Sequence, residues 1–194
     1  MSSYGRDTVI SVFGSHAPKP GSRLYEMARE LGGLLAEAGF TVASGGYEGT
    51  MAGVSQGAAE AGGHTIGVTS SVVKASRDVS LNRWIGKEVQ YESLQDRLYH
   101  LVTKNDGMVV LEGGIGTLSE LSLAWSLLQV REIDERPLIL LGQLWKDTLP
   151  VFIREEYVSE EITRLITMVD SPSEAVEYLM SFRAGARKKE KHDF

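Results

Sequence analysis

The chain has 194 residues and a formal net charge of -6, with 20 lysine and arginine residues against 26 aspartate and glutamate residues. This length suits one domain with a substantial core, and the negative charge makes a nucleic-acid partner unlikely on physical grounds. The sequence has no cysteine and only four histidines, which excludes disulfides and cysteine nucleophiles. We expect no metal site.

No apolar run approaches the roughly 20 residues that a membrane span requires, and the N-terminal residues are polar. We therefore expect a cytoplasmic protein with no membrane partner.

Short apolar runs alternate with longer helical patterns in the first half of the chain, as in a parallel sheet wrapped by helices. Strands are predicted at 9–13, 40–43 and 64–68, and helices at 23–38 and 51–61. Ser22 is the predicted cap of the first helix. Apolar residues recur at helical spacing along that helix and define its core face.

The second half continues the alternation after an irregular segment at 69–89. Strands are predicted at 106–111, 137–141 and 166–169, and helices at 91–104, 145–157 and 172–182, the last capped by Ser171. The predicted fold class is α/β, a Rossmann-like open parallel sheet flanked by helices on both faces.

We interpret residues 1–182 as a single Rossmann-like nucleotide-binding domain. Residues 183–194 are basic and contain few apolar side chains. They are predicted to form a flexible tail, because a solvated terminus is a simpler reading of this composition than a nucleic-acid arm.

The segment 111–121 has the pattern of a phosphate site. Glycines directly after an apolar strand let the backbone approach a ligand, and the amides at the start of the next helix attract anions. Thr117 adds a hydroxyl donor, and Glu120 can reach past a phosphate to sugar hydroxyls or to a bond being broken. The alternative is a capping box, with Thr117 near the cap and Glu120 as its partner.

Ligands of open parallel sheets lie outside the carboxyl ends of the strands, where the strand order reverses. Three glycine-bearing loops are expected at this edge. The candidate phosphate or nucleotide-binding residues are Gly14, Ser15, Ser44, Gly45, Gly46, Gly49, Thr50, Met51, Gly113, Gly114, Ile115, Gly116 and Thr117. The first loop lacks the dinucleotide fingerprint and no lysine precedes Thr117, so neither an NAD reductase nor an ATPase is supported.

Two of these loops carry motifs of a known family. Residues 44–53, Ser-Gly-Gly-Tyr-Glu-Gly-Thr-Met-Ala-Gly, match a Gly-Gly-Gly-x-x-Gly-x-Met-Gly pattern. Residues 112–120 match Pro-Gly-Gly-x-Gly-Thr-x-x-Glu. The chain thus resembles the Lonely Guy (LOG) family, often labelled lysine decarboxylase, over roughly residues 9–178. More distantly, it resembles molybdenum cofactor carriers and DNA-processing Rossmann-like proteins.

The resemblance implies a homodimer that hydrolyses the N-glycosidic bond of a nucleoside 5′-monophosphate, AMP or a cytokinin ribotide. The products are the free base and ribose 5-phosphate, and no cofactor is implied. It assigns catalysis to Arg97 and Glu120. A carboxylate can stabilise the cationic ribose or orient water, and an arginine suits a phosphate or a departing base.

Other interpretations remain open at the level of sequence. Arg97 could be an exposed arginine paired with Glu92 or Asp96. Glu112, Ser119 and Leu98 depart from the family pattern, which leaves the substrate open. A nucleotide or molybdenum-cofactor carrier would keep the same loops without hydrolysis, and a nucleic-acid module is opposed by the net charge. No lysine lies in a motif that suggests a Schiff base, so a pyridoxal-phosphate decarboxylase is not supported.

The apolar face with Trp125 and Leu128 is predicted to form a twofold dimer contact. His16 and the pair Asn82 and Arg83 lie in loops near the site edge, where they either contact the ligand or are solvated.

Overall fold

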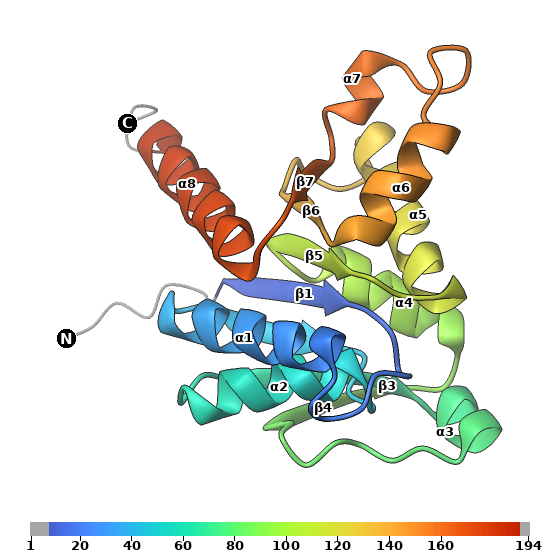
Figure 1. Cartoon of the computed structure of the whole chain (residues 1–194), viewed down its shortest axis with the longest axis vertical. Coiled ribbons are helices and arrows are strands. Elements are labelled where there is room, and N and C mark those ends of the chain that lie inside the picture. The colour runs from blue at the N-terminus through green and yellow to red at the C-terminus, as the bar shows by residue number, and fades with distance from the viewer. Residues whose placement is uncertain (1–7, 191–194) are drawn as a thin grey trace.

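The computed structural model describes residues 8–190, and one seven-stranded parallel sheet organises them (Figure 1). The strand order is β4-β3-β2-β1-β5-β6-β7. The strands are β1 (Val9–Phe13), β2 (Thr41–Ser44), β3 (Thr65–Ser70), β4 (Lys87–Tyr91), β5 (Gly107–Leu111), β6 (Leu138–Leu141) and β7 (Thr167–Val169). The chain builds outward from β1 to β4 and then returns to the other side of β1, so the strand order reverses between β1 and β5.

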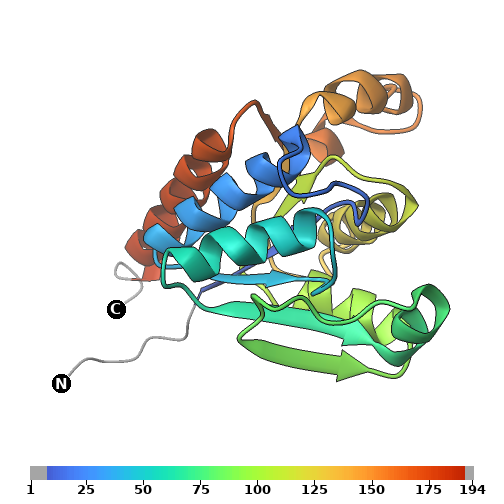
Figure 2. The ribbon, with the colours of Figure 1, turned by 60° about the horizontal axis from the view of Figure 1, so that its bottom comes forward.

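Helices cover both faces of the sheet (Figure 2). Helices α1 (Arg23–Glu37), α2 (Thr50–Glu60) and α8 (Pro172–Glu190) pack on one face, and α4 (Leu94–Thr103), α5 (Ile115–Gln129) and α6 (Gln143–Phe152) pack on the other. Two short helices, α3 (Ser71–Arg77) and α7 (Glu160–Thr163), lie in connections. The predicted Rossmann-like α/β fold is therefore confirmed.

The central strands divide their side chains between two cores. In β5, Met108 and Val110 join the core under α4 and α5, whereas Val109 and Leu111 join the core under α1 and α2. Strands buried on both faces must be apolar at every position, and this explains the continuous apolar runs in the sequence.

Helices α1 and α2 pack with their backbones unusually close. A Cβ added to Gly57 would lie 1.8 Å from the carbonyl oxygen of Arg29, and one added to Gly32 would lie 2.0 Å from that of Val54. Only glycine fits at these two positions. This close contact sets the position of α2, and with it the loop that precedes α2.

The predicted irregular segment 69–89 is wrong in part, because it contains α3 and the start of the edge strand β4. Helix α4 consequently begins at Leu94, capped by Ser93, whose hydroxyl accepts from the amide of Asp96. Helix α6 ends at Phe152, earlier than expected, and α7 was not expected. Ser22 precedes α1, but its side chain makes no capping hydrogen bond, whereas Ser171 does accept from the amide of Glu174.

The expected flexible tail is partly helical, since α8 continues to Glu190 instead of ending at Phe182. The added stretch is rich in alanine, arginine and lysine, which are strong helix formers. The rest of that expectation, residues 191–194, lies outside the described residues. Within residues 8–190, no helix combines the length and the apolar character needed to span a bilayer.

Candidate functional site

The loops after β1 and β2 interlock at the carboxyl edge of the sheet. The backbone amide and hydroxyl of Thr50 both donate to the carbonyl oxygen of Ser15, at 2.8 and 3.1 Å. A Cβ on Gly14 would lie 2.3 Å from the Thr50 hydroxyl, and one on Gly49, which has φ +74°, would lie 2.2 Å from the Ser15 carbonyl oxygen. Glycine is thus required where the two loops cross.

Buried side chains hold the turn after β2 through hydrogen bonds to its backbone. Gly46 has φ +77°, and its amide donates to the hydroxyl of Ser44. The sequence had suggested that Ser44 binds a ligand. Ser44 is fully buried, however, so its hydroxyl shapes the turn and does not face a ligand. Buried Asn82 donates from Nδ2 to the carbonyl oxygens of Gly46 and Tyr47, at 3.1 and 3.0 Å. Asn82 therefore has a structural role and is neither a ligand contact nor solvated.

The loop after β5 is open where a phosphate would approach. Gly114 is the N-cap of α5, and a Cβ at Gly114 or Gly116 would have no neighbouring atom within 4 Å. Ile115 is 80% exposed. Gly113 lies under Thr117, because a Cβ there would be 2.1 Å from the Thr117 hydroxyl oxygen. Gly114, Ile115 and Gly116 are exposed at the start of this 15-residue helix, and the start of a helix is the end that attracts anions.

The capping-box interpretation of this segment is wrong. The cap is Gly114, so Thr117 is the third residue inside α5 and Glu120 lies a full turn further on. Both side chains are buried, at 2% and 7% exposure. Their positions therefore need an explanation other than capping.

Glu112, which replaces the family proline, has its carboxylate engaged by other parts of the chain. Its carboxylate accepts from Arg23 at 3.1 Å and from the backbone amide of Gln143 at 3.2 Å. The glutamate is thereby paired with α1 and with the start of α6. Its negative charge is compensated there, which reduces its repulsion of an anion at α5.

Arg97 is buried beneath the glycine loop and is not an exposed surface arginine. It is 7% exposed, and its Nε donates to the carbonyl oxygen of Val68 at 2.8 Å. Its guanidinium lies over the ring of Tyr47 at 5.5 Å. A Cβ on Gly45 would come within 2.2 Å of Nη2, so glycine at this position lets the guanidinium reach the loop.

The alternative partners of Arg97 are engaged elsewhere. Asp96 accepts from the hydroxyl of Ser93, and Glu92 accepts from that of Ser71. Leu98, which replaces a basic residue common in the family, is half-buried on α4. Ser119 donates to the carbonyl oxygen of Ile115 within α5.

Glu120 is a buried carboxyl group whose pKa is shifted well above its usual range. Burial raises its pKa from 4.5 to about 7, and the nearby positive charge of Arg97 opposes that rise. The structure thus brings together the two residues that the family motifs single out. A buried carboxyl group with a pKa near 7, close enough to a guanidinium for that charge to lower the pKa, can serve either in proton transfer or in stabilising a cation.

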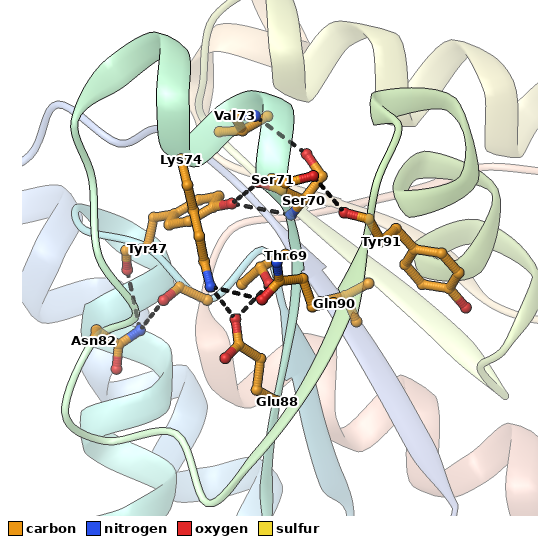
Figure 3. A network of polar contacts seen from close by, with 12 residues as sticks. Tyr47, Thr69, Ser70, Ser71, Val73, Lys74, Asn82, Glu88, Gln90 and Tyr91 are labelled. Carbon is orange, nitrogen blue, oxygen red and sulfur yellow. Dashed lines mark hydrogen bonds and ion pairs between the residues drawn. The ribbon is translucent and has the colours of Figure 1, made fainter.

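A polar network that was not foreseen supports the side of the site next to β3 (Figure 3). The hydroxyl of Tyr47 accepts from the amide of Ser70 and donates to its carbonyl oxygen. Lys74 of α3 and Thr69 both bind Glu88 of β4. These hydrogen bonds lower the pKa of Glu88. The network attaches α3 and β4 to the ring that packs against Arg97.

Tyr47 is the residue at this site that the sequence analysis missed. An aromatic side chain directly after Gly46, inside an otherwise small and polar loop, is the signal that could have identified it. Met51 is 8% exposed, and a Cβ added to Gly45 would lie 2.6 Å from its sulfur, so it packs under the loop and is not open to a ligand.

The other predicted residues are two loop residues near the site and two apolar residues of α5. His16 is exposed. The guanidinium of Arg83 lies over the ring of Trp84 at 4.6 Å. Trp125 and Leu128 are buried in this chain's own core, and the indole of Trp125 donates to the carbonyl oxygen of Ile162. Those two side chains therefore cannot supply the predicted dimer contact.

Fold and site define a Rossmann-like α/β protein whose glycine loops gather at the switch point of the sheet. The chain matches the SLOG cluster4 family over residues 7–176, and it belongs to that family. This agrees with the resemblance to LOG proteins found in the motifs.

The chain is also similar to named proteins and to a solved structure. It is 31% identical over 123 residues to the cytokinin riboside 5′-monophosphate phosphoribohydrolase of Mycobacterium tuberculosis, covering 62% of this chain and 63% of that protein. It is 30% identical over 171 residues to the probable cytokinin riboside 5′-monophosphate phosphoribohydrolase LOGL5 of Oryza sativa subsp. japonica, covering 85% and 68%. The structure of the molybdenum cofactor binding protein from Rippkaea orientalis superposes with a TM-score of 0.71 at 26% identity, over 91% of this chain and 98% of that one.

Proposed function

We propose that the protein hydrolyses the N-glycosidic bond of a nucleoside 5′-monophosphate, with AMP or a cytokinin ribotide as substrate. The observation that carries this proposal is that Arg97 and Glu120 are both buried, with the Arg97 guanidinium against the glycine loop at Gly45 and close enough to Glu120 to lower the pKa of its carboxyl group. The names of the relatives at about 30% identity support the reaction class. The chain spans 63% of the first of these relatives and 68% of the second.

The phosphate is proposed to lie at the exposed start of α5. There Ile115 and Gly116 are exposed in the first turn of the helix, at the positive end of its dipole. The rest of the nucleotide would extend from this point toward the loop of Gly45 and Gly46. In this proposal the ribose lies near Glu120, which is about one and a half turns into α5.

In the proposed reaction, the bond between C1′ and the base nitrogen breaks as water adds its oxygen to C1′. One proton of the water goes to the departing base, and the other remains on the new hydroxyl of ribose 5-phosphate. Ionised Glu120 stabilises the positive charge that develops on the ribose and orients the water. Arg97 holds the nucleotide in line and lowers the pKa of Glu120 against the effect of burial.

Release of adenine from AMP tests the activity and its assignment. Glu120→Gln should retain the fold and most of the affinity yet lose at least ~100-fold in turnover, the usual scale for an electrostatic catalytic group. Arg97→Ala should lose both affinity and rate. Base release at the full rate in Glu120→Gln would reject this role for Glu120.

The position of the phosphate is tested separately. Gly114→Asp adds a negative charge at a place where a Cβ meets nothing within 4 Å, so the variant should fold and lose AMP affinity by calorimetry. Gly185→Asp is the matched control, because Gly185 lies on α8 and is equally open. Equal AMP affinity in the two variants would place the phosphate elsewhere.

A carrier of nucleotide or molybdenum cofactor is the second candidate. It is favoured by the likeness to the Rippkaea orientalis protein over nearly the whole chain. In that case the wild type would release no base from AMP, other 5′-monophosphates or cytokinin ribotides, and the two variants would change binding alone.

A homodimer in the cytoplasm remains part of the proposal. Since Trp125 and Leu128 are internal, the exposed apolar side chains of α5 are better candidates for the contact, namely Ile115 at 80% and Leu118 at 44% exposure. Ile115→Asp combined with Leu118→Asp should give monomers by light scattering. A wild type that is monomeric at micromolar concentration would overturn the dimer.

A further inference from the structure

A cavity lies at the amino ends of the strands, whereas the glycine loops follow the carboxyl ends. Its volume is about 600 Å³, within the range of small-molecule sites. It is lined by the first residues of three parallel strands, Thr41 of β2, Thr65 of β3 and Lys87 of β4. Because Gly14, Gly45 and Gly113 follow the last residues of their strands, this cavity is separate from the proposed active site.

The charged residues of this lining are all basic. They are Arg83 and Lys87, and no aspartate or glutamate contributes to the lining, which also includes the imidazole of His64. Among the described residues, no carboxylate forms an ion pair with Arg83 or Lys87. The contrast within the molecule is clear, since a groove of about 410 Å³ on α1 and α2 is lined by four glutamates. In a chain of net charge -6, a basic cavity of this kind attracts anions.

The cavity also offers an aromatic surface. Trp84 is half-buried in its lining, and the guanidinium of Arg83 lies over the indole at 4.6 Å. Ile66 and Ile85 add apolar wall. A planar ring can extend such a stack, while the edge of the guanidinium donates to a phosphate or carboxylate.

The segment that carries Trp84 is held in place before any ligand arrives. The hydroxyl of Thr65 donates to the carbonyl oxygen of Trp84 at 2.7 Å and accepts from the amide of Gly86 at 2.8 Å. The side chain of Asn82 accepts from the amide of Trp84 at 3.1 Å. Thr65 and Asn82 are both buried. A rigid wall binds a ligand without a large ordering penalty.

We propose that this cavity is a binding site for a small aromatic anion of nucleotide size, stacked beside Trp84 and held by Arg83 and Lys87. The base or ring occupies the apolar wall, and the anionic group meets the basic side chains. This proposal is independent of the reaction at the other edge of the sheet.

The three tryptophans of the chain provide the readout. Trp125 and Trp145 are 8% and 3% exposed, and their indole groups donate to carbonyl oxygens of the chain. Trp84 is the one that lines the cavity. In protein labelled with 5-fluorotryptophan, the ¹⁹F resonance of Trp84 is the one that disappears in the Trp84→Phe variant. AMP and GMP are then titrated into the Gly114→Asp variant, which leaves the cavity unchanged.

Both nucleotides should shift the Trp84 resonance saturably. Arg83→Gln should weaken this binding at least ~10-fold, as expected for losing a charge-assisted contact, while Arg154→Gln, an exposed arginine outside the cavity lining, should leave it unchanged. No shift with either nucleotide would overturn the proposal, as would unchanged affinity in Arg83→Gln. Equal shifts from adenosine would remove the anionic requirement, and equal shifts from inorganic phosphate would remove the aromatic one. Either result would reject the proposed ligand class.

Discussion

The raised pKa of Glu120 has a measurable effect on the stability of the whole protein. The pKa rises from 4.5 to about 7 on folding, which makes ionisation of this carboxyl group harder in the folded state by about 3 kcal/mol. Between these two values, the native protein keeps the proton and the unfolded chain has lost it. The native state then binds more protons, so the free energy of unfolding decreases as the pH rises from about 4.5 to about 7.

Glu120→Gln removes this titration and keeps the shape of the side chain. The free energy of unfolding of the variant minus that of the wild type should therefore increase by about 3 kcal/mol between pH 4 and pH 8.5. Nearly all of the increase should fall between pH 4.5 and pH 7.5. A change of this size is a large fraction of the stability of an ordinary domain.

Urea unfolding at a series of pH values measures this difference. Glu161→Gln removes an exposed carboxylate from α7 and serves as the control for net charge alone. If the difference between Glu120→Gln and the wild type stays constant with pH to within ~0.5 kcal/mol, the carboxyl group ionises as easily in the folded protein as in water. The burial argument for its role would then be wrong.

If ionised Glu120 assists the reaction, kcat/KM for AMP should rise with pH and level off above about 7; a fall over this range would make it a proton donor instead. Gly57→Ala should destabilise the protein by at least ~2 kcal/mol in urea unfolding, because its Cβ would lie 1.8 Å from a carbonyl oxygen. Gly33→Ala is the control. Its Cβ would have its nearest neighbour at 3.7 Å, so this substitution should change the stability by less than ~1 kcal/mol. Equal effects of the two would refute the close-contact argument. Glu112→Ala should lower stability by about 1 kcal/mol, since the first amide of α6 loses its acceptor, and an unchanged unfolding midpoint would show that water replaces it.

The parts of the fold that the sequence predicts are those governed by burial on both faces. Continuous apolar runs mark β1, β5 and β6, and the long amphipathic pattern marks α1. Edge elements follow weaker rules. Strand β4 lies at the edge of the sheet and begins with two charged residues, Lys87 and Glu88. Its apolar side chains are only Val89 and Tyr91, so its sequence does not stand out from a loop.

The candidate site shows the same division. The positions of the glycine loops follow from their order after the strands, but the role of each side chain depends on tertiary contacts. Asn82 is distant in sequence from Gly46, and its buried amide is recognisable only once β3 and the loop before β4 are in place. For Arg97, the spacing to Leu101 four residues later on the same helical stripe does point to the core side.

The interlocked loops after β1 and β2 also affect how a ligand is held. Thr50 donates two hydrogen bonds to the carbonyl oxygen of Ser15. The backbone of Gly14 packs so closely against Thr50 that there is no room for a Cβ between the two loops. Neither loop can open without displacing the other. A molecule that enters this edge therefore meets walls that have already lost their conformational freedom, so little of its binding energy is needed to order the protein.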